Sequence, residues 1–340
     1  SPNPQSGDWG GIVICGTAPI NTSTLGTQGL YEVEGGINNS NGDGFAGSGD
    51  AAFPTGNSND NSGTLSYVRI EYAGYAFQPD KEINSLTMAG VGSGTTIDHI
   101  QVTYAKDDAY EWFGGTVNCK YLIAFKTQDD DFDTDNGYSG NVQFGLIMRD
   151  SLIADISTSE AFESDNNSGG TTATPKTSAV FSNITAIGPR ATLNNVGNTL
   201  YRAGAQIRRN SSISIFNSII MGWPQAVLID ATTGTSTALN IEDSSLRLRN
   251  ITIAGCATST RFSGTVGATI NNDAAFAYSK IVNIKINGDA TLETRVMPNP
   301  FTGKLDIYLT LPHSCMVSFS FMDLNGKVVY SKTVKGLKGS

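Results

Sequence analysis

Short strands of alternating apolar residues return along this chain at nearly constant intervals. The segment from Leu65 to Tyr72 matches the segment from Ile97 to Tyr104 at an offset of 32 residues. Further along, Asn183, Asn217 and Asn250 each precede an apolar strand, and they stand 34 and then 33 residues apart. A shorter step of 21 residues joins two triplets, Ile100, Val102, Tyr104 and Tyr121, Ile123, Phe125. Repeats at such periods are typical of supersecondary units stacked into a solenoid.

The composition favours strands and turns over helices. The 340 residues include 38 glycines, and only 16% of the residues are charged. Coils of these lengths with three short strands each suit a parallel β-helix, in which like side chains stack about 4.8 Å apart. The sequence lacks the LxxLxL pattern of a leucine-rich repeat, and Asn-Gly and Asp-Gly turns are too sparse for a propeller. We therefore predict an all-β protein with a parallel β-helix over residues 1–290.

The C-terminal segment, residues 291–340, follows a different pattern. Its apolar residues alternate strictly with polar ones, as in Leu305, Ile307 and Leu309 and again in Val317 and Phe319. A period of two with one polar face indicates antiparallel strands. We predict that this segment forms a small antiparallel β-sandwich.

Charge and hydropathy exclude several classes of partner. The formal net charge of −9 argues against nucleic acid, because a phosphate-binding surface needs clustered Lys and Arg. Cations and neutral glycans are better matches. No apolar run approaches the ~18 residues of a transmembrane helix. The first residue is Ser1, which indicates a mature or trimmed fragment.

The four cysteines do not form a metal-binding motif. Cys15, Cys119, Cys256 and Cys315 are far apart and make no CxxC pair, which disfavours zinc. Each is expected to be a small core residue. A disulfide would require two of them to meet across coils or between chains.

Four motifs carry a resemblance to a known group of proteins. They are GDWGGIVICG (7–16), NSGTLSYVRIEYAG (61–74), VGSGTTIDHIQVTYAKDDAYEWFGGTVN (91–118) and DDDFDTDNGYSGNVQFG (129–145). Together they resemble secreted right-handed parallel β-helix proteins of Bacteroidetes, whose activity is largely unassigned, and the resemblance covers about residues 7–255. It implies a right-handed solenoid and an extracellular location, and says little about chemistry.

The C-terminal segment resembles a second family. MPNPFTGKLDIYLTL (297–311) and FMDLNGKVVY (321–330) look like the C-terminal sorting domain that directs cargo through the type IX secretion system. The resemblance implies the secretion machinery as a partner and the outer cell surface or the medium as the destination. Members of the first group usually carry coils before GDWGG, and sorting domains usually continue with further strands. Open strand edges at both ends would invite self-association, head to tail.

The candidate metal ligands lie in the most acidic stretch of the chain. Alternating carboxylates in Asp131-x-Asp133-x-Asp135 suggest an oxygen-rich calcium loop. It is not an EF-hand, because Asn136 stands where Gly is needed and Val142 where a bidentate Glu is needed. In an extended strand the carboxylates would be about 6.6 Å apart, so this loop must curl. An offset near 21 places Asp107 and Asp108 beside it. We predict a calcium site from Asp129, Asp131, Asp133, Asp135, Asp107 and Asp108.

Two other interpretations of the acidic stretch stay open. One is a solvated acidic ridge beside Lys106, Lys120 and Lys126. The other is a glycosidase, because carboxylates on adjacent or next-but-one coils bracket the separations that retaining and inverting enzymes use. The catalytic candidates would then be Asp107, Asp108, Glu111, Asp129, Asp130 and Asp131.

The aromatic and histidine residues near the acidic stretch are a weaker signal. Tyr110, Trp112 and Phe113 are either a sugar platform or, more in keeping with a Gly-Gly turn after them, a core plug at a corner. The chain has 2 histidines, which disfavours a Ser-His-Asp hydrolase. Of these, His99 is expected beside the acidic stretch.

We favour a non-catalytic function. The prediction is an exported cell-surface or extracellular structural protein, adhesive or self-assembling into a filament or matrix, with acidic turns stiffened by calcium. The alternatives are a polysaccharide-cleaving enzyme of pectate-lyase-like architecture, either a hydrolase or a lyase, and a glycan-binding module without turnover. The fold alone does not separate these functions.

Overall fold

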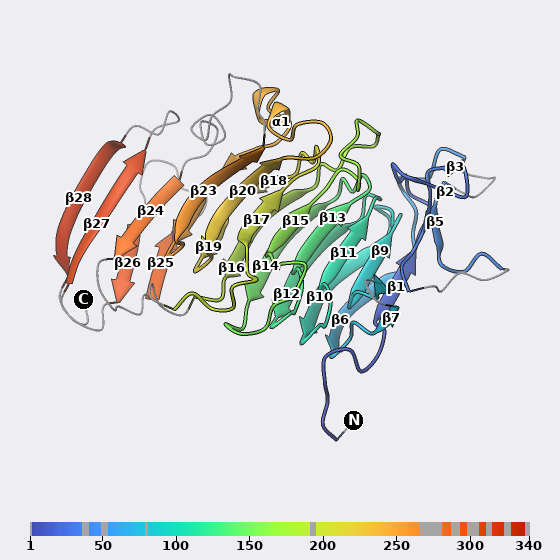
Figure 1. Ribbon diagram of the computed structural model, residues 1–340, viewed down its shortest axis with the longest axis horizontal. Helices are drawn as coiled ribbons and strands as arrows, with labels where there is room; N and C mark the ends of the chain where they lie inside the picture. Colours follow the sequence, from blue (N-terminus) through green and yellow to red (C-terminus); the bar gives the residue numbers. More distant parts are fainter. Residues whose placement is uncertain are drawn as a thin grey trace.

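The computed structural model is a solenoid of parallel strands, seen as stacked arrows in Figure 1. It describes residues 2–35, 41–48, 54–78, 81–190 and 195–264, and beyond these the backbone of five strands at 281–286, 293–297, 306–310, 315–322 and 328–336. The predicted all-β parallel β-helix is confirmed. Within the described residues the single α-helix, α1 (Leu239–Glu242), has 4 residues, and no helix is long and apolar enough to cross a membrane.

Two long sheets run along the solenoid. The first contains, in spatial order, β1 (Ile12–Cys15), β9 (Leu86–Ala89), β11 (Tyr110–Phe113), β13 (Phe132–Asp135), β15 (Phe162–Ser164), β17 (Ala203–Ile207), β20 (Gln225–Ala231) and β23 (Thr258–Gly264). Its strands are joined in parallel. We call it the first sheet.

The second sheet begins with β6 (Thr64–Glu71), β10 (Thr96–Thr103), β12 (Asn118–Phe125), β14 (Asn141–Met148), β16 (Val180–Ile187), β19 (Ile219–Met221) and β22 (Ile251–Ala254). It continues through β24 (Ile281–Ile286), β27 (Cys315–Met322) and β28 (Val328–Gly336). In addition, β18 (Ser214–Phe216) pairs with β16, and β21 (Leu248–Arg249) pairs with β18. Small two-stranded sheets complete the fold: β2 (Ser23–Thr24) with β3 (Thr27–Gln28), β4 (Leu30–Glu32) with β5 (Phe45–Gly47), β7 (Ala76–Gln78) with β8 (Lys81–Glu82), and β25 (Glu293–Met297) with β26 (Asp306–Thr310).

The register confirms one predicted offset and corrects another. Ile100 of β10 pairs with Val68 of β6, as the offset of 32 requires. On its other side Ile100 pairs with Leu122 of β12, so this step is 22 residues and the predicted step of 21 is wrong. The error arose because the side-chain alternation in these strands is interrupted, so apolar residues coincide at both offsets. Tyr104 and Phe125 still lie in neighbouring coils, with ring centroids 6.2 Å apart.

The interruption is a residue with positive φ, which lies within β6, β10, β12, β14 and β16 and, in the next two coils, between β18 and β19 and between β21 and β22. These left-handed residues form one column, Tyr67, His99, Tyr121, Phe144, Asn183, Asn217 and Asn250, with φ between 50° and 63°. Asn tolerates this region best among residues with a Cβ. Asn250 Nδ2 donates to Asn217 Oδ1 at 3.1 Å, so the amides also stack. His99 lies here, on the second sheet, and not beside the acidic stretch as we expected.

Replacing Asn217 by Val should lower the free energy of unfolding by about 1–2 kcal/mol, because a β-branched residue is strained at φ 50°. Asn217→Gly removes the same amide without that strain and should cost less. Urea unfolding followed by circular dichroism measures both. Equal losses in the two variants would mean that the amide stack, and not the backbone conformation, selects Asn at this position.

Large aromatic side chains fill the interior beneath the first sheet. Tyr110 and Trp112 are fully buried, and the Trp112 ring stacks on Tyr138 at 5.3 Å. Tyr110 Oη donates to the carbonyl oxygens of Ile100 and Ile123, which belong to adjacent coils of the second sheet. Phe113 is covered by Tyr31. The sugar-platform hypothesis for these residues is therefore wrong, and the corner-plug interpretation is confirmed.

The C-terminal strands are antiparallel, as the period of two predicted. β25 pairs with β26, and β27 pairs with both β24 and β28. Through β24, which is parallel to β22, the antiparallel strands continue the second sheet. Whether their side chains pack as a sandwich lies outside the described residues. Cys15, Cys119 and Cys256 are free thiols, and Cys315 is not among the residues whose side chains are described.

Candidate functional site

Three acidic residues occupy the same place in successive coils, just before a strand of the first sheet. Asp108 precedes β11, Asp130 precedes β13 and Glu160 precedes β15. One Asp108 oxygen accepts the Asp130 N–H at 2.8 Å, and one Asp130 oxygen accepts the Glu160 N–H at 2.5 Å. The Asp108 and Asp130 carboxylates thus each satisfy a backbone N–H of the next coil. An acidic side chain can accept this N–H because the position lies just before the strand, where the regular backbone hydrogen bonds between strands have not yet started.

A second acidic column follows three residues later. Glu111, Asp133 and Glu163 are aligned in register on β11, β13 and β15, with side chains on the outer face of the first sheet. In each coil the pattern is acid-x-aromatic-acid, and the aromatic residue points into the core: Tyr110, Phe132 and Phe162 are at most 1% exposed. The parallel register therefore brings together pairs of acids that are 22 and 30 residues apart in the sequence.

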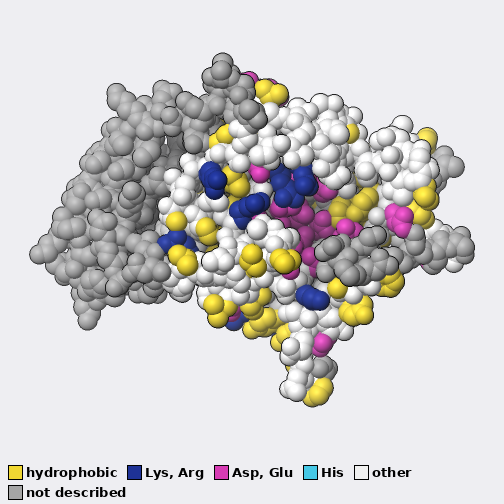
Figure 2. Space-filling model, in the orientation of Figure 1, with side chains coloured by type: hydrophobic (Ala, Val, Ile, Leu, Met, Phe, Trp, Pro, Cys, Tyr) yellow, Lys and Arg dark blue, Asp and Glu magenta, His cyan; other side chains and the backbone are white. Residues whose placement is uncertain are grey.

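The two columns approach each other closely enough to share cations. Three groups have ligand oxygens within 4.8 Å of one another: Asp107, Asp108 and Asp129; Asp108, Glu111 and Asp133; and Asp130, Glu160 and Glu163. We call these eight residues the acidic cluster. Figure 2 shows acidic side chains gathered in one patch on this face, with basic side chains at its upper edge.

Some carboxylate oxygens of the acidic cluster are buried without a partner. The Glu160 side chain is 0% exposed, and its Oε2 accepts no hydrogen bond from any described residue. Asp129 Oδ1 is in the same situation, although its Oδ2 accepts from Ser157 Oγ at 2.8 Å. A buried ionised oxygen without a partner costs several kcal/mol unless a proton or a cation compensates it.

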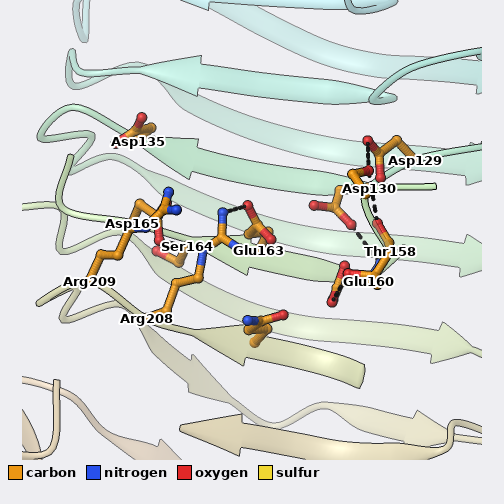
Figure 3. Close-up of polar contacts among 12 residues, drawn as sticks. Asp129, Asp130, Asp135, Thr158, Glu160, Glu163, Ser164, Asp165, Arg208 and Arg209 are labelled. Atoms are coloured by element: carbon orange, nitrogen blue, oxygen red, sulfur yellow. Dashed lines mark hydrogen bonds and ion pairs between the residues drawn. The ribbon is translucent and has the colours of Figure 1, made fainter. Parts of the chain in front are cut away.

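Two arginines from the next coil border the acidic cluster. Arg208 contacts Glu163 and donates to Asp165 at 2.8 Å, and Arg209 contacts the other Asp165 oxygen at 2.7 Å. Figure 3 shows both guanidinium groups reaching toward these two acids, with Glu160 further along their coil and Asp130 on the coil before it. These ion pairs neutralise one side of the cluster only. Glu160 has its nearest guanidinium 4.0 Å away, on Arg202.

Burial raises the pKa of every acid in the centre of the acidic cluster. It raises the pKa of Glu160 to about 8, with repulsion from Glu163 as the next cause, and the pKa of Asp129 to about 7. For Asp108, Asp130 and Asp133, burial and then neighbouring carboxylates place the pKa well above the usual range. The same holds for Glu111. Near neutral pH these groups hold either protons or cations.

The cluster is suited to a hard cation. All its side-chain donors are carboxylate oxygens, the ligand type that Ca²⁺ and Mg²⁺ prefer. Ca²⁺ accepts 6–8 oxygens in flexible geometry, which suits carboxylates contributed by several coils. The solvated-ridge interpretation is wrong for the centre of the cluster, because Asp108, Glu111, Asp130 and Glu160 are all at most 7% exposed. Lys126, expected beside the ridge, instead pairs with Asp150 at 3.1 Å.

The structure separates the predicted ligands into two sets. Asp107, Asp108, Asp129 and Asp133 belong to the acidic cluster, as do Glu111 and Asp130 from the catalytic candidates. Asp131 and Asp135 belong to no such group. Asp131 forms an ion pair with Arg149 at 3.1 Å in which both side chains are 0% exposed. Asp135 accepts the Asn136 N–H at 2.6 Å.

The predicted calcium loop is not a loop. Asp133 and Asp135 lie within the extended strand β13, where side chains two residues apart are too distant to share one ion. Carboxylates meet across coils and not along the segment. Glu160 and Glu163 are not among the predicted ligands, although Glu160-Ala-Phe-Glu163 repeats the acid-x-aromatic-acid pattern of Asp108-Ala-Tyr-Glu111. Arg208 and Arg209 have no such local signal.

Comparison with known proteins identifies the fold family. The chain matches no curated protein and no solved structure. The family model described as a pectate-lyase like beta helix domain matches residues 1–294, most of the chain. The stacked parallel strands of both sheets and the match over this length lead to one conclusion: the chain belongs to the pectate-lyase-like β-helix family.

Proposed function

We propose that the protein is an exported, non-catalytic β-helix scaffold of the cell surface, adhesive or self-assembling, whose acidic cluster binds calcium. One observation carries the calcium part: Glu160, a fully buried carboxylate with an unpartnered oxygen, lies within 4.8 Å of Asp130 and Glu163. A cation between these oxygens would offset both their burial and their mutual repulsion. Because the ligands come from successive coils, the ion would fasten the coils together.

The burial of the acidic cluster favours a structural role over catalysis. A catalytic carboxylate must reach the scissile bond of a polymer, whereas Asp130 is 5% exposed and Glu160 0%. Arg208, the cationic side chain nearest the outer column, is occupied by Glu163 and Asp165. The proposal includes secretion by the type IX machinery, which is supported only by the sequence motifs at 297–311 and 321–330. It also includes self-association through strand edges.

Calcium titration tests the metal part. Isothermal titration calorimetry of the chelator-treated protein at pH 7.5, in two buffers of different ionisation enthalpy, should show binding with release of protons, because acids with raised pKa values lose protons to the metal. Glu160→Gln should weaken binding by about tenfold or more. Glu242→Gln, an exposed residue of α1, is the matched control and should bind as the unaltered chain does. An absence of heat and of proton release at millimolar calcium would mean that the cluster is compensated by protons.

A second candidate function is polysaccharide cleavage. Asp133 and Glu163 are half-buried and directly paired across β13 and β15, and neighbouring carboxylates with different pKa values are the pattern of a general acid and a nucleophile. Burial raises the pKa of Glu163 to about 6, whereas that of Asp133 lies well above its usual range. Release of oligosaccharides from a polymer by the protein, abolished in Glu163→Gln, would replace the scaffold proposal by this one.

A further inference from the structure

A groove runs over the outer face of the second sheet, away from the acidic cluster. The side chains of Tyr67, His99, Tyr121 and Phe144, which we call the ring column, line this groove. Gln101 and Ile123 also line it, and its volume is about 610 Å³. This size falls within the range of ligand sites, about 300–1,000 Å³.

The rings of the ring column stack on one another in a regular way and are also exposed to solvent. Successive rings stack with centroids 4.3, 4.4 and 5.1 Å apart and with interplanar angles of 9°, 23° and 16°. Tyr67 nevertheless remains 79% exposed, Tyr121 44% and Phe144 41%. A contiguous exposed apolar surface of this kind marks an interaction site. Rings already held in place lose little conformational freedom when a ligand binds.

The ionisable side chains at the edges of the groove have partners. His99 Nδ1 lies 3.0 Å from Asp98 Oδ1, and Arg69 contacts Glu71. The groove therefore lacks the excess charge that would select an ionic ligand, in contrast to the acidic cluster on the first sheet. The neutral polar residues that line it are Gln101 and Asn183, with side-chain amides, and Tyr67 and Tyr121, with hydroxyl groups.

We propose that this groove binds a neutral polysaccharide chain lying along the solenoid axis across the four coils of the ring column. Strands of one sheet follow each other at about 4.8 Å, which is close to the advance of one sugar unit in an extended β-1,4-linked chain. The C–H groups of each unit pack against the ring column and Ile123. Hydroxyl groups bond to the amides and to the tyrosine hydroxyls, which are the polar ends of otherwise apolar side chains.

Binding of cellohexaose and xylohexaose by the full chain, measured by calorimetry, tests the proposal. Both should bind with an affinity that hexagalacturonate does not match. Tyr67→Ala and Tyr121→Ala should each weaken binding by tenfold or more. Tyr104→Ala is the matched control: Tyr104 stacks on Tyr72 at 5.2 Å on the same sheet but outside the groove, so its loss should leave the affinity unchanged. Unchanged melting temperatures of the three variants verify that they fold.

The proposal stands apart from the calcium site. Binding of the neutral oligosaccharides should persist in excess chelator at a temperature where the protein stays folded, so failure of one proposal leaves the other intact. Absence of binding to both neutral hexamers would overturn it, as would tighter binding of hexagalacturonate. If Tyr67→Ala and Tyr121→Ala convert an oligomer to a monomer and the unaltered chain binds no sugar, the groove is an interface between copies.

Discussion

Arg149→Met is expected to lower the free energy of unfolding by about 3–5 kcal/mol, the cost of removing one partner of a buried ion pair. Arg149 lies 3.1 Å from Asp131, and both side chains are 0% exposed. Its guanidinium also donates to the carbonyl oxygens of Asp129 at 2.6 Å and Gln128 at 3.0 Å and lies 5.0 Å from the Tyr201 ring. The substitution leaves Asp131 buried without a counter-charge, and the turn that carries Asp129 loses two donors. Urea unfolding gives the midpoint and slope from which the loss follows.

Two further variants separate charge burial from packing. Arg149→Met combined with Asp131→Leu removes both charges and should recover more than half of the loss, because a buried pair is often replaced by apolar residues at little cost. Arg69→Met breaks an exposed pair with Glu71 and should cost less than about 1 kcal/mol. If Arg149→Met is no less stable than Arg69→Met, the buried pair between Arg149 and Asp131 does not stabilise the turn that carries Asp129.

Calcium is expected to raise the melting temperature by about 6 °C at pH 8 and by much less at pH 5. At a free concentration of 1,000 times Kd, binding to the folded state alone adds about 4 kcal/mol. For a chain of 340 residues, an unfolding entropy of about 2.1 cal/mol/K per residue makes 1 kcal/mol equivalent to about 1.5 °C. At pH 5 calcium must first displace protons from the acidic cluster. Differential scanning calorimetry with calcium or with chelator measures the difference.

The chelated protein should lose stability as the pH rises. The folded pKa values of Asp129, Glu163 and Glu160 are about 7, 6 and 8, all above the unfolded values near 4. The folded state therefore binds more protons than the unfolded state, and ∂ΔG/∂pH is negative between about pH 4 and pH 8. Glu160→Gln should flatten this slope. A melting temperature that rises across this window in chelator would show that these acids are ionised and paired in the folded protein.

The acidic cluster explains why only part of the site was predictable. Asp108 and Asp130 were recognisable as neighbours because an approximate repeat is enough to place two acids in adjacent coils. The further step to Glu160 spans 30 residues and includes a long turn, so its length does not match the earlier step of 22, and only the repeated acid-x-aromatic-acid pattern marks Glu160 as an equivalent position. Arg208 contacts Glu163 from the following coil, just after β17, and no pattern in the sequence predicts that contact.

The sequence by itself determined the solenoid, because alternating apolar residues at regular intervals bury a continuous core only when coils stack. It also determined which stretch would be acidic. Only the tertiary structure decided the register, since the left-handed residues such as His99 and Tyr121 interrupt the alternation and make steps of 21 and 22 look alike. Register in turn decides which side chains share a face. For this reason the burial of Glu160, the isolation of Asp131 with Arg149 and the exposed ring column could not be read from the chain.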